Sequence, residues 1–136
     1  MRVGVVVPTT KASVPEPPPT VGGEVVPDVL INYLTLFKDQ HKDNIPDPAR
    51  DKFIVNMDGL VSLIHQRDNF GRAKYGQPLM SEDGRNGVED AKQELGDLLQ
   101  YLMNCQLAGG PEVISEDDKE LFITGFMVAK QILNGK

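Results

Sequence analysis

Three carboxylates and a tyrosine recur at helical spacing near the centre of the chain: Asp90, Glu94, Asp97 and Tyr101. At 100° per residue, offsets of 4, 7 and 11 residues place all of them on one face of an α-helix. We call Asp90, Glu94 and Asp97 the acidic row. Carboxylates stacked one turn apart repel each other by about 0.2–0.5 kcal/mol, and a bound cation removes that repulsion. The spacing therefore indicates either a metal-binding face or a solvated acidic edge of a helical bundle.

A further carboxylate, Asp68, lies four residues after Ile64 and so falls on an apolar helical stripe. It could pair with Arg72 one turn later, or it could meet the acidic row from a neighbouring helix. The second arrangement would form an oxygen-rich site of the kind that Mg²⁺ or Mn²⁺ selects. His65 beside it suits a hydrogen bond as well as a metal. With 2 histidines and 1 cysteine in the chain, a zinc site is disfavoured.

Cationic side chains stand between Asp68 and the acidic row, namely Arg72, Lys74 and Arg85, with Tyr75 among them. In a triphosphate site, metal ions hold the reacting oxygens while Lys and Arg neutralise the outer ones. A solvated basic turn is the alternative for the same residues. Tyr75 could stack on a nucleobase or anchor the loop in the core.

The elements that must position these residues are helical. Apolar residues at 3.6-residue spacing predict helices over 28–41, over 48–73, and from about 91 to the stop at Gly109-Gly110-Pro111. Ser115, with Asp118 three residues later, resembles a capping box that opens a last helix extending to Leu133. We therefore expect an all-α, four-helix bundle over 28–136. We expect residues 1–27 to form a Pro-rich N-terminal arm, in which Val3–Val7 could add as an edge strand.

Composition excludes several classes of function. The net charge of -6 repels nucleic acid and anionic membrane surfaces, whereas a polyphosphate bridged by divalent cations is compatible with it. Cys105 is the one cysteine, so no intrachain disulfide is expected. No apolar run approaches the roughly 20 residues of a membrane span, and no secretory signal is recognisable. We expect a soluble, cytoplasmic protein.

Two motifs carry a family resemblance. The string from Glu94 to Leu99 resembles the Glu-x-x-Asp signature of the MazG-like all-α nucleoside triphosphate pyrophosphohydrolases. The segment from Arg67 to Leu79 is similar to the RDxxGRxKYGxPL segment of small phage-encoded members, including the MazZ-type dGTP/dATP pyrophosphohydrolases. The chain departs from the pattern at Gln93, which replaces a glutamate. It also lacks the superfamily's first-helix Glu-x-x-Glu pair, for which Asp68, alone or with Asp58 or Asp90, could stand in.

The resemblance implies hydrolysis between the α and β phosphates of (deoxy)nucleoside triphosphates, with purine dNTPs (dGTP and/or dATP) as the substrates. It implies two or three Mg²⁺ or Mn²⁺ ions per site, a homodimer or homotetramer, and the host cytoplasm if the gene is carried by a phage. It assigns catalysis to Glu94, Asp97 and Lys74; metal binding to Asp68, Glu94, Asp97 and Asp90; and substrate binding to Arg72, Lys74, Tyr75, Arg85, Asn86 and Tyr101. The rival functions are a non-catalytic oligomeric helical protein and a nucleotide-binding regulator.

Overall fold

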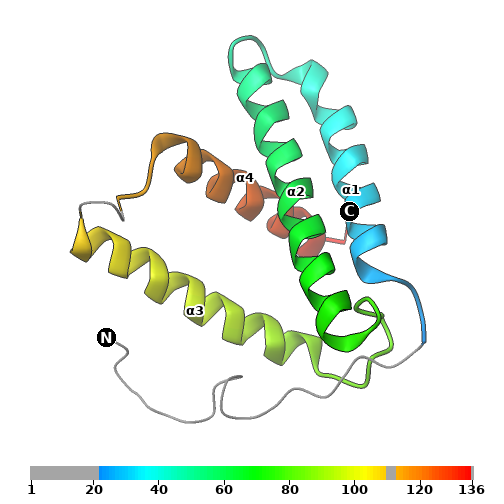
Figure 1. Ribbon diagram of the computed structural model, residues 1–136. Helices are drawn as coiled ribbons and strands as arrows, with labels where there is room; N and C mark the ends of the chain where they lie inside the picture. Colours follow the sequence, from blue (N-terminus) through cyan, green and yellow to red (C-terminus); the bar gives the residue numbers. More distant parts are fainter. Residues whose placement is uncertain (1–21, 110–112, 136) are drawn as a thin grey trace.

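The computed structural model describes residues 22–109 and 113–135, and these residues form an all-helical protein (Figure 1). The elements in chain order are α1 (Val26–His41), the 3-10 helix η1 (Lys42–Asn44), α2 (Ala49–Tyr75), α3 (Gly87–Ala108) and α4 (Glu116–Leu133). The prediction of an all-α fold with four α-helices is confirmed. The expected strand at Val3–Val7 lies outside the described residues.

The helix ends follow the local sequence. Pro27 lies in the first turn of α1, where its missing N–H leaves no hydrogen bond unmade. The Ser115 hydroxyl accepts a hydrogen bond from the Asp118 N–H at 3.1 Å, which confirms the cap predicted for α4. The side chain of Asn86 caps α3 in the same way by accepting from the Glu89 N–H at 3.1 Å. Gly76 ends α2 in the left-handed conformation (φ 77°), which glycine adopts without steric penalty.

The packed core joins α1, α2 and α4. Its buried apolar side chains are Leu34, Phe37, Phe53, Met57 and Val128. The helices α2 and α4 approach closely where each carries a glycine. A Cβ atom at Gly59 would lie 3.2 Å from Leu121 of α4, and one at Gly125 would lie 3.5 Å from Leu60 of α2. These three helices therefore form the part of the fold that is stabilised by burial.

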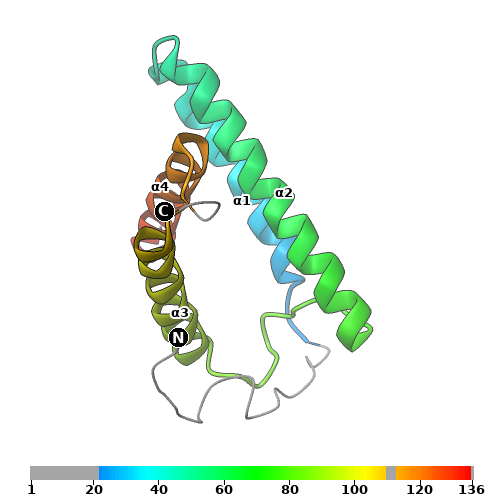
Figure 2. The same ribbon diagram turned by 60° about the vertical axis from the view of Figure 1, so that its left-hand side comes forward.

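Helix α3 runs apart from α1 and α2 (Figures 1 and 2). Not one of its residues is buried. Its apolar side chains Leu95, Leu99, Met103 and Leu107 are 55–78% exposed. Their exposure matters because isolated helices are marginal in water, and most helical stability in proteins comes from packing an apolar face.

The start of α1 is tied to the loop that follows α2. Val25 forms an isolated antiparallel bridge with Met80, and the Val26 N–H donates to the Leu79 carbonyl at 2.9 Å. The Glu24 N–H also donates to the Ser81 hydroxyl at 2.8 Å. Residues 22–27, expected as the end of the arm, are therefore paired backbone and the first turn of α1, because their donors find acceptors in this loop.

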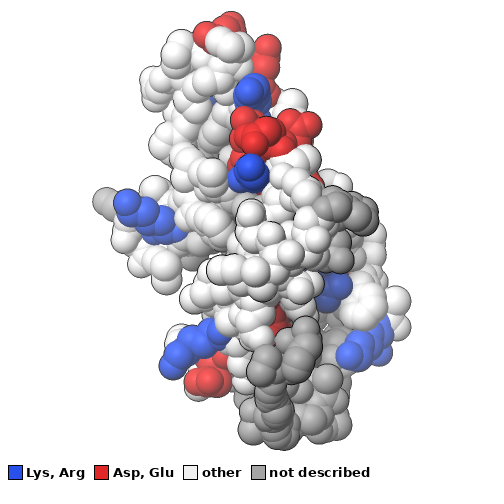
Figure 3. Space-filling view, turned by 90° about the vertical axis from the view of Figure 1, so that its left-hand side faces the viewer, with Lys and Arg blue, Asp and Glu red and all other residues white. Residues whose placement is uncertain are grey.

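Charged side chains are unevenly spread. Figure 3, which faces the side where α3 ends, shows small groups of acidic and basic residues separated by a broad uncharged area. The sequence of α3 agrees, since Asp97 is its last charged residue and 98–108 are all uncharged. Within the described part of the chain, no helix is both long and apolar enough to cross a membrane.

Candidate functional site

Helix α3 carries the acidic row as predicted, on a continuous helix from Gly87 to Ala108. Asp90 and Asp97 are half-buried, whereas Glu94 and Tyr101 are exposed. Asn86, expected among the substrate-binding residues, uses its side-chain oxygen as the cap of this helix. The prediction that these residues share one helical face holds, since the helix is unbroken across them.

Arg85 and Asp90 form an ion pair across the start of α3. The Nε and Nη2 atoms of Arg85 lie 2.9 and 2.8 Å from the same carboxylate oxygen of Asp90. The side chains are 15% and 35% exposed, so solvent screens this pair less than a fully exposed one. The structure thus brings together two predicted site residues as partners of each other. Arg85 neutralises Asp90 and ties the loop to α3.

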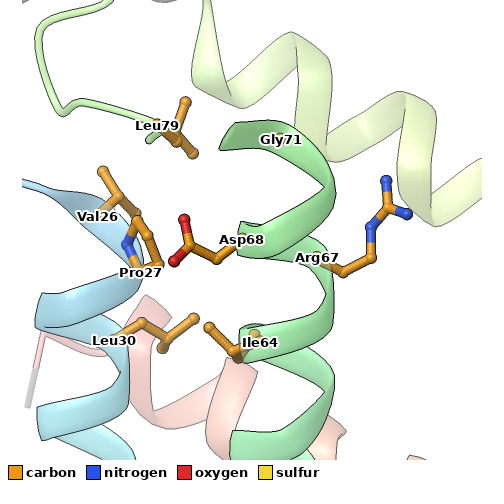
Figure 4. Close-up of a pocket in the computed structure, with 8 residues that line it drawn as sticks. All are labelled: Val26, Pro27, Leu30, Ile64, Arg67, Asp68, Gly71 and Leu79. Atoms are coloured by element: carbon orange, nitrogen blue, oxygen red, sulfur yellow. The ribbon is translucent and has the colours of Figure 1, made fainter. Parts of the chain in front are cut away.

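Asp68 belongs to α2, and its side chain, which is 10% exposed, lies between α2 and the start of α1. The Nε of Arg72 lies 2.9 Å from both carboxylate oxygens. Figure 4 shows Asp68 pointing toward Pro27 of α1, while Arg67 points away from the opposite side of α2. Of the two arrangements that the sequence left open, the pair with Arg72 is the one present in the structure.

The expected convergence of Asp68 with the acidic row is not found. Among the described residues, no three or more His, Cys, Asp or Glu side chains lie close enough to hold a metal ion together. Asp68 faces α1, whereas the acidic row belongs to α3, which runs apart. The described residues of one chain, as they are arranged, therefore do not form a multi-carboxylate metal site. No metal-dependent step follows from this geometry.

The basic segment near the end of α2 contains two cation–aromatic contacts. The Arg67 guanidinium lies 4.7 Å from the centroid of the Phe70 ring, and the Lys74 ammonium lies 5.2 Å from that of Tyr75. Phe70 is 54% exposed, whereas Tyr75 is half-buried. Both distances are within the range in which a cation is attracted to a ring face. The segment therefore presents positive charge and an exposed aromatic ring on the same helix.

A cavity of about 190 Å³ surrounds Asp68. Its walls include Pro27 and Leu30 of α1, Ile64 and Gly71 of α2, and Leu79 of the following loop (Figure 4). Sequence reasoning missed this cavity, because Leu79 and the start of α1 are brought to α2 by backbone pairing of distant segments. One signal was present, since Ile64, Asp68 and Gly71 lie at offsets of 4 and 7 and therefore share a face of α2.

Comparisons with known proteins identified no relative of this chain. No family model matches the chain, and comparisons with curated proteins and with solved structures find no significant match. The resemblance of the two motifs to the MazG-like enzymes therefore stays a prediction.

Proposed function

We propose that this protein hydrolyses nucleoside triphosphates to the monophosphate and pyrophosphate, with Mg²⁺ or Mn²⁺ as the cofactor. Purine deoxynucleotides such as dGTP and dATP are the proposed substrates, and control of the nucleotide pool is the proposed role. The two motifs that resemble the MazG-like enzymes support the proposal. The segment from Arg67 to Leu79 covers the end of α2 and the start of the following loop, and the string from Glu94 to Leu99 lies in the middle of α3.

One observation carries the proposal: Glu94 and Asp97 lie one turn apart on α3, on the same face as Tyr101. Catalysis is assigned to Glu94 and Asp97 because they are the Glu and Asp of the Glu-x-x-Asp motif. Lys74 is assigned to the outer phosphates, because an exposed ammonium neutralises phosphate oxygens without a fixed geometry.

The proposal includes assembly of two or more copies. Leu95, Leu99, Met103 and Leu107 leave one side of α3 apolar and exposed. A second copy is the proposed partner, because the uncharged half of α3 (98–108) can meet its own counterpart without like-charge repulsion in a protein of net charge -6.

The test is a panel of all common dNTPs and NTPs with Mg²⁺ or Mn²⁺, in which monophosphate and pyrophosphate are measured by chromatography. Glu94→Gln and Asp97→Asn should abolish metal-dependent pyrophosphate release and leave the circular dichroism spectrum unchanged. Glu89→Gln is the matched control, because Glu89 is an exposed α3 carboxylate outside the acidic row. Full activity in both Glu94→Gln and Asp97→Asn would refute the proposal.

A non-catalytic helical protein that assembles through α3 is the second candidate. The observation that favours it is the lack of a metal-holding group among the described residues, together with the exposed apolar side of α3. Calorimetric titration with Mn²⁺ separates the two candidates. A catalytic site should show saturable binding that Asp97→Asn removes, whereas a packing surface should show none.

A further inference from the structure

The proposed reaction does not use the cavity around Asp68. Its walls are aliphatic side chains from α1, α2 and Leu79, with Arg67 and Gly71 of α2 also lining it, and the carboxylate of Asp68 projects among them (Figure 4). A cavity of about 190 Å³ is smaller than the roughly 300–1,000 Å³ of sites that enclose a drug-sized ligand. It therefore suits one planar ring system whose remaining atoms stay outside.

The charge of Asp68 is already balanced. Arg72 donates through Nε to both carboxylate oxygens at 2.9 Å, and Arg72 Nη2 lies 4.0 Å from Asp28. A neutralised carboxylate has no strong preference for a cation. An ionised carboxylate nevertheless offers about four lone-pair positions, of which Arg72 occupies two. The remaining positions are free to accept from neutral N–H donors of a ligand in the cavity, where water has little access because the side chain is only 10% exposed.

The two carboxylate oxygens of Asp68 indicate which hydrogen-bonding groups the ligand must present. Two acceptors held side by side match a ring edge with two adjacent N–H donors. Guanine has that edge in its N1–H and 2-amino groups. Adenine presents a single amino group next to a ring nitrogen that is itself an acceptor. One carboxylate oxygen of Asp68 would therefore face that ring nitrogen, and the two acceptors would repel each other. Aliphatic walls above and below complete a site for a flat ring.

We propose that this cavity binds the guanine ring of a nucleotide and that Asp68 is the residue that distinguishes guanine from adenine. The inference rests on the proposed function for the presence of a nucleotide. Lys74 follows Gly71 by three residues, one turn nearer the end of α2, where phosphates extending from the cavity would reach it. Asp68 is thereby assigned to recognition of the base, a role separate from that of the acidic row.

The experiment measures binding of dGMP, dIMP and dAMP by calorimetry in the absence of metal. Monophosphates are not hydrolysed by the proposed reaction, so the result does not depend on whether the protein is an enzyme. The wild-type protein should bind dGMP about 5- to 150-fold more tightly than dAMP, the range expected for one bidentate contact. Binding of dIMP should be weaker than that of dGMP, because its ring lacks the 2-amino group.

Two variants act on different parts of the cavity. Asp68→Asn replaces one acceptor by an amide donor, which would oppose the 2-amino group, so the preference should reverse in favour of dIMP. Gly71→Leu should fill the cavity and remove binding of all three ligands. A Cβ atom at Gly71 meets no atom within 4 Å, so a side chain can be attached at this position without a clash at its Cβ.

Matched controls are Asp58→Asn, at a carboxylate of α2 that is 61% exposed, and Ala73→Leu, at an exposed position of the same helix. Both should bind dGMP as the wild type does. Equal affinity of the wild type for dGMP and dAMP, absence of saturable dGMP binding, or unchanged dGMP binding by Gly71→Leu would each overturn the assignment. None of these results would affect the hydrolysis test, which measures loss of pyrophosphate release in the α3 variants.

Discussion

Leu99→Ala should separate the copies of this protein without unfolding the chain. Leu99 lies on the exposed apolar side of α3 and is 57% exposed in the single chain. Its truncation removes little burial from the folded chain, so the free energy of unfolding of the monomer should change by less than about 0.5 kcal/mol, as for other exposed substitutions. A large effect on association must therefore come from the surface of another copy that covers Leu99 in the assembly.

The magnitude follows from the exposed fraction. Complete burial of a leucine side chain contributes about 1.5–3 kcal/mol, so covering 57% of Leu99 contributes about 1–2 kcal/mol per copy. A two-fold interface contains the residue twice. Leu99→Ala should therefore weaken association by about 2–3.5 kcal/mol, which corresponds to about 30- to 300-fold in Kd.

Analytical ultracentrifugation over a wide range of protein concentrations measures this change directly. Leu36→Ala is the matched control, because Leu36 of α1 is 50% exposed and lies on another helix. A wild-type protein that stays monomeric at the highest concentration would refute the reasoning. Equal Kd values for Leu99→Ala and the wild type would refute it as well.

Three further outcomes follow from the packing. Met57→Ala removes a core side chain that is 1% exposed and should lower the free energy of unfolding by about 2–5 kcal/mol in urea denaturation. Ser115→Ala removes the cap of α4 and should lower it by about 0.5–2 kcal/mol, whereas Ser115→Asp should restore most of the loss. Asp58→Asn breaks the exposed ion pair with Lys38 (3.1 Å) and should change it by less than about 1 kcal/mol, measured at low and high salt.

The secondary structure could be predicted well because its causes are local. The apolar repeat that places Leu34 and Phe37 on one face of α1 acts within a few turns of the chain. The Ser115 cap and the glycine after Ala108 likewise act on adjacent backbone groups. The largest error in the boundaries concerns residues 22–27, because their hydrogen bonds go to Leu79 and Ser81, more than fifty positions later in the sequence.

The candidate site could be predicted only in part. The sequence identified Asp90 and Arg85 as charged residues of one region, but their 2.8 Å ion pair depends on how the loop before α3 folds back. It placed Asp68 on the inner side of α2 but left open which neighbour would cover that side. Helical periodicity fixes the direction of a side chain relative to its own axis and says nothing of the next helix.

The amino-acid sequence alone thus determined the helices, their caps and the face on which the acidic row lies, since each of these results from interactions a few residues apart. Only the tertiary structure decided that Asp68 points into an apolar cavity beside α1 and that α3 runs apart from α2 (Figures 2 and 4). The reason is physical. Which helix covers which face depends on the joint burial of side chains and on the loops that connect the helices, and these contacts join residues that are far apart in the chain.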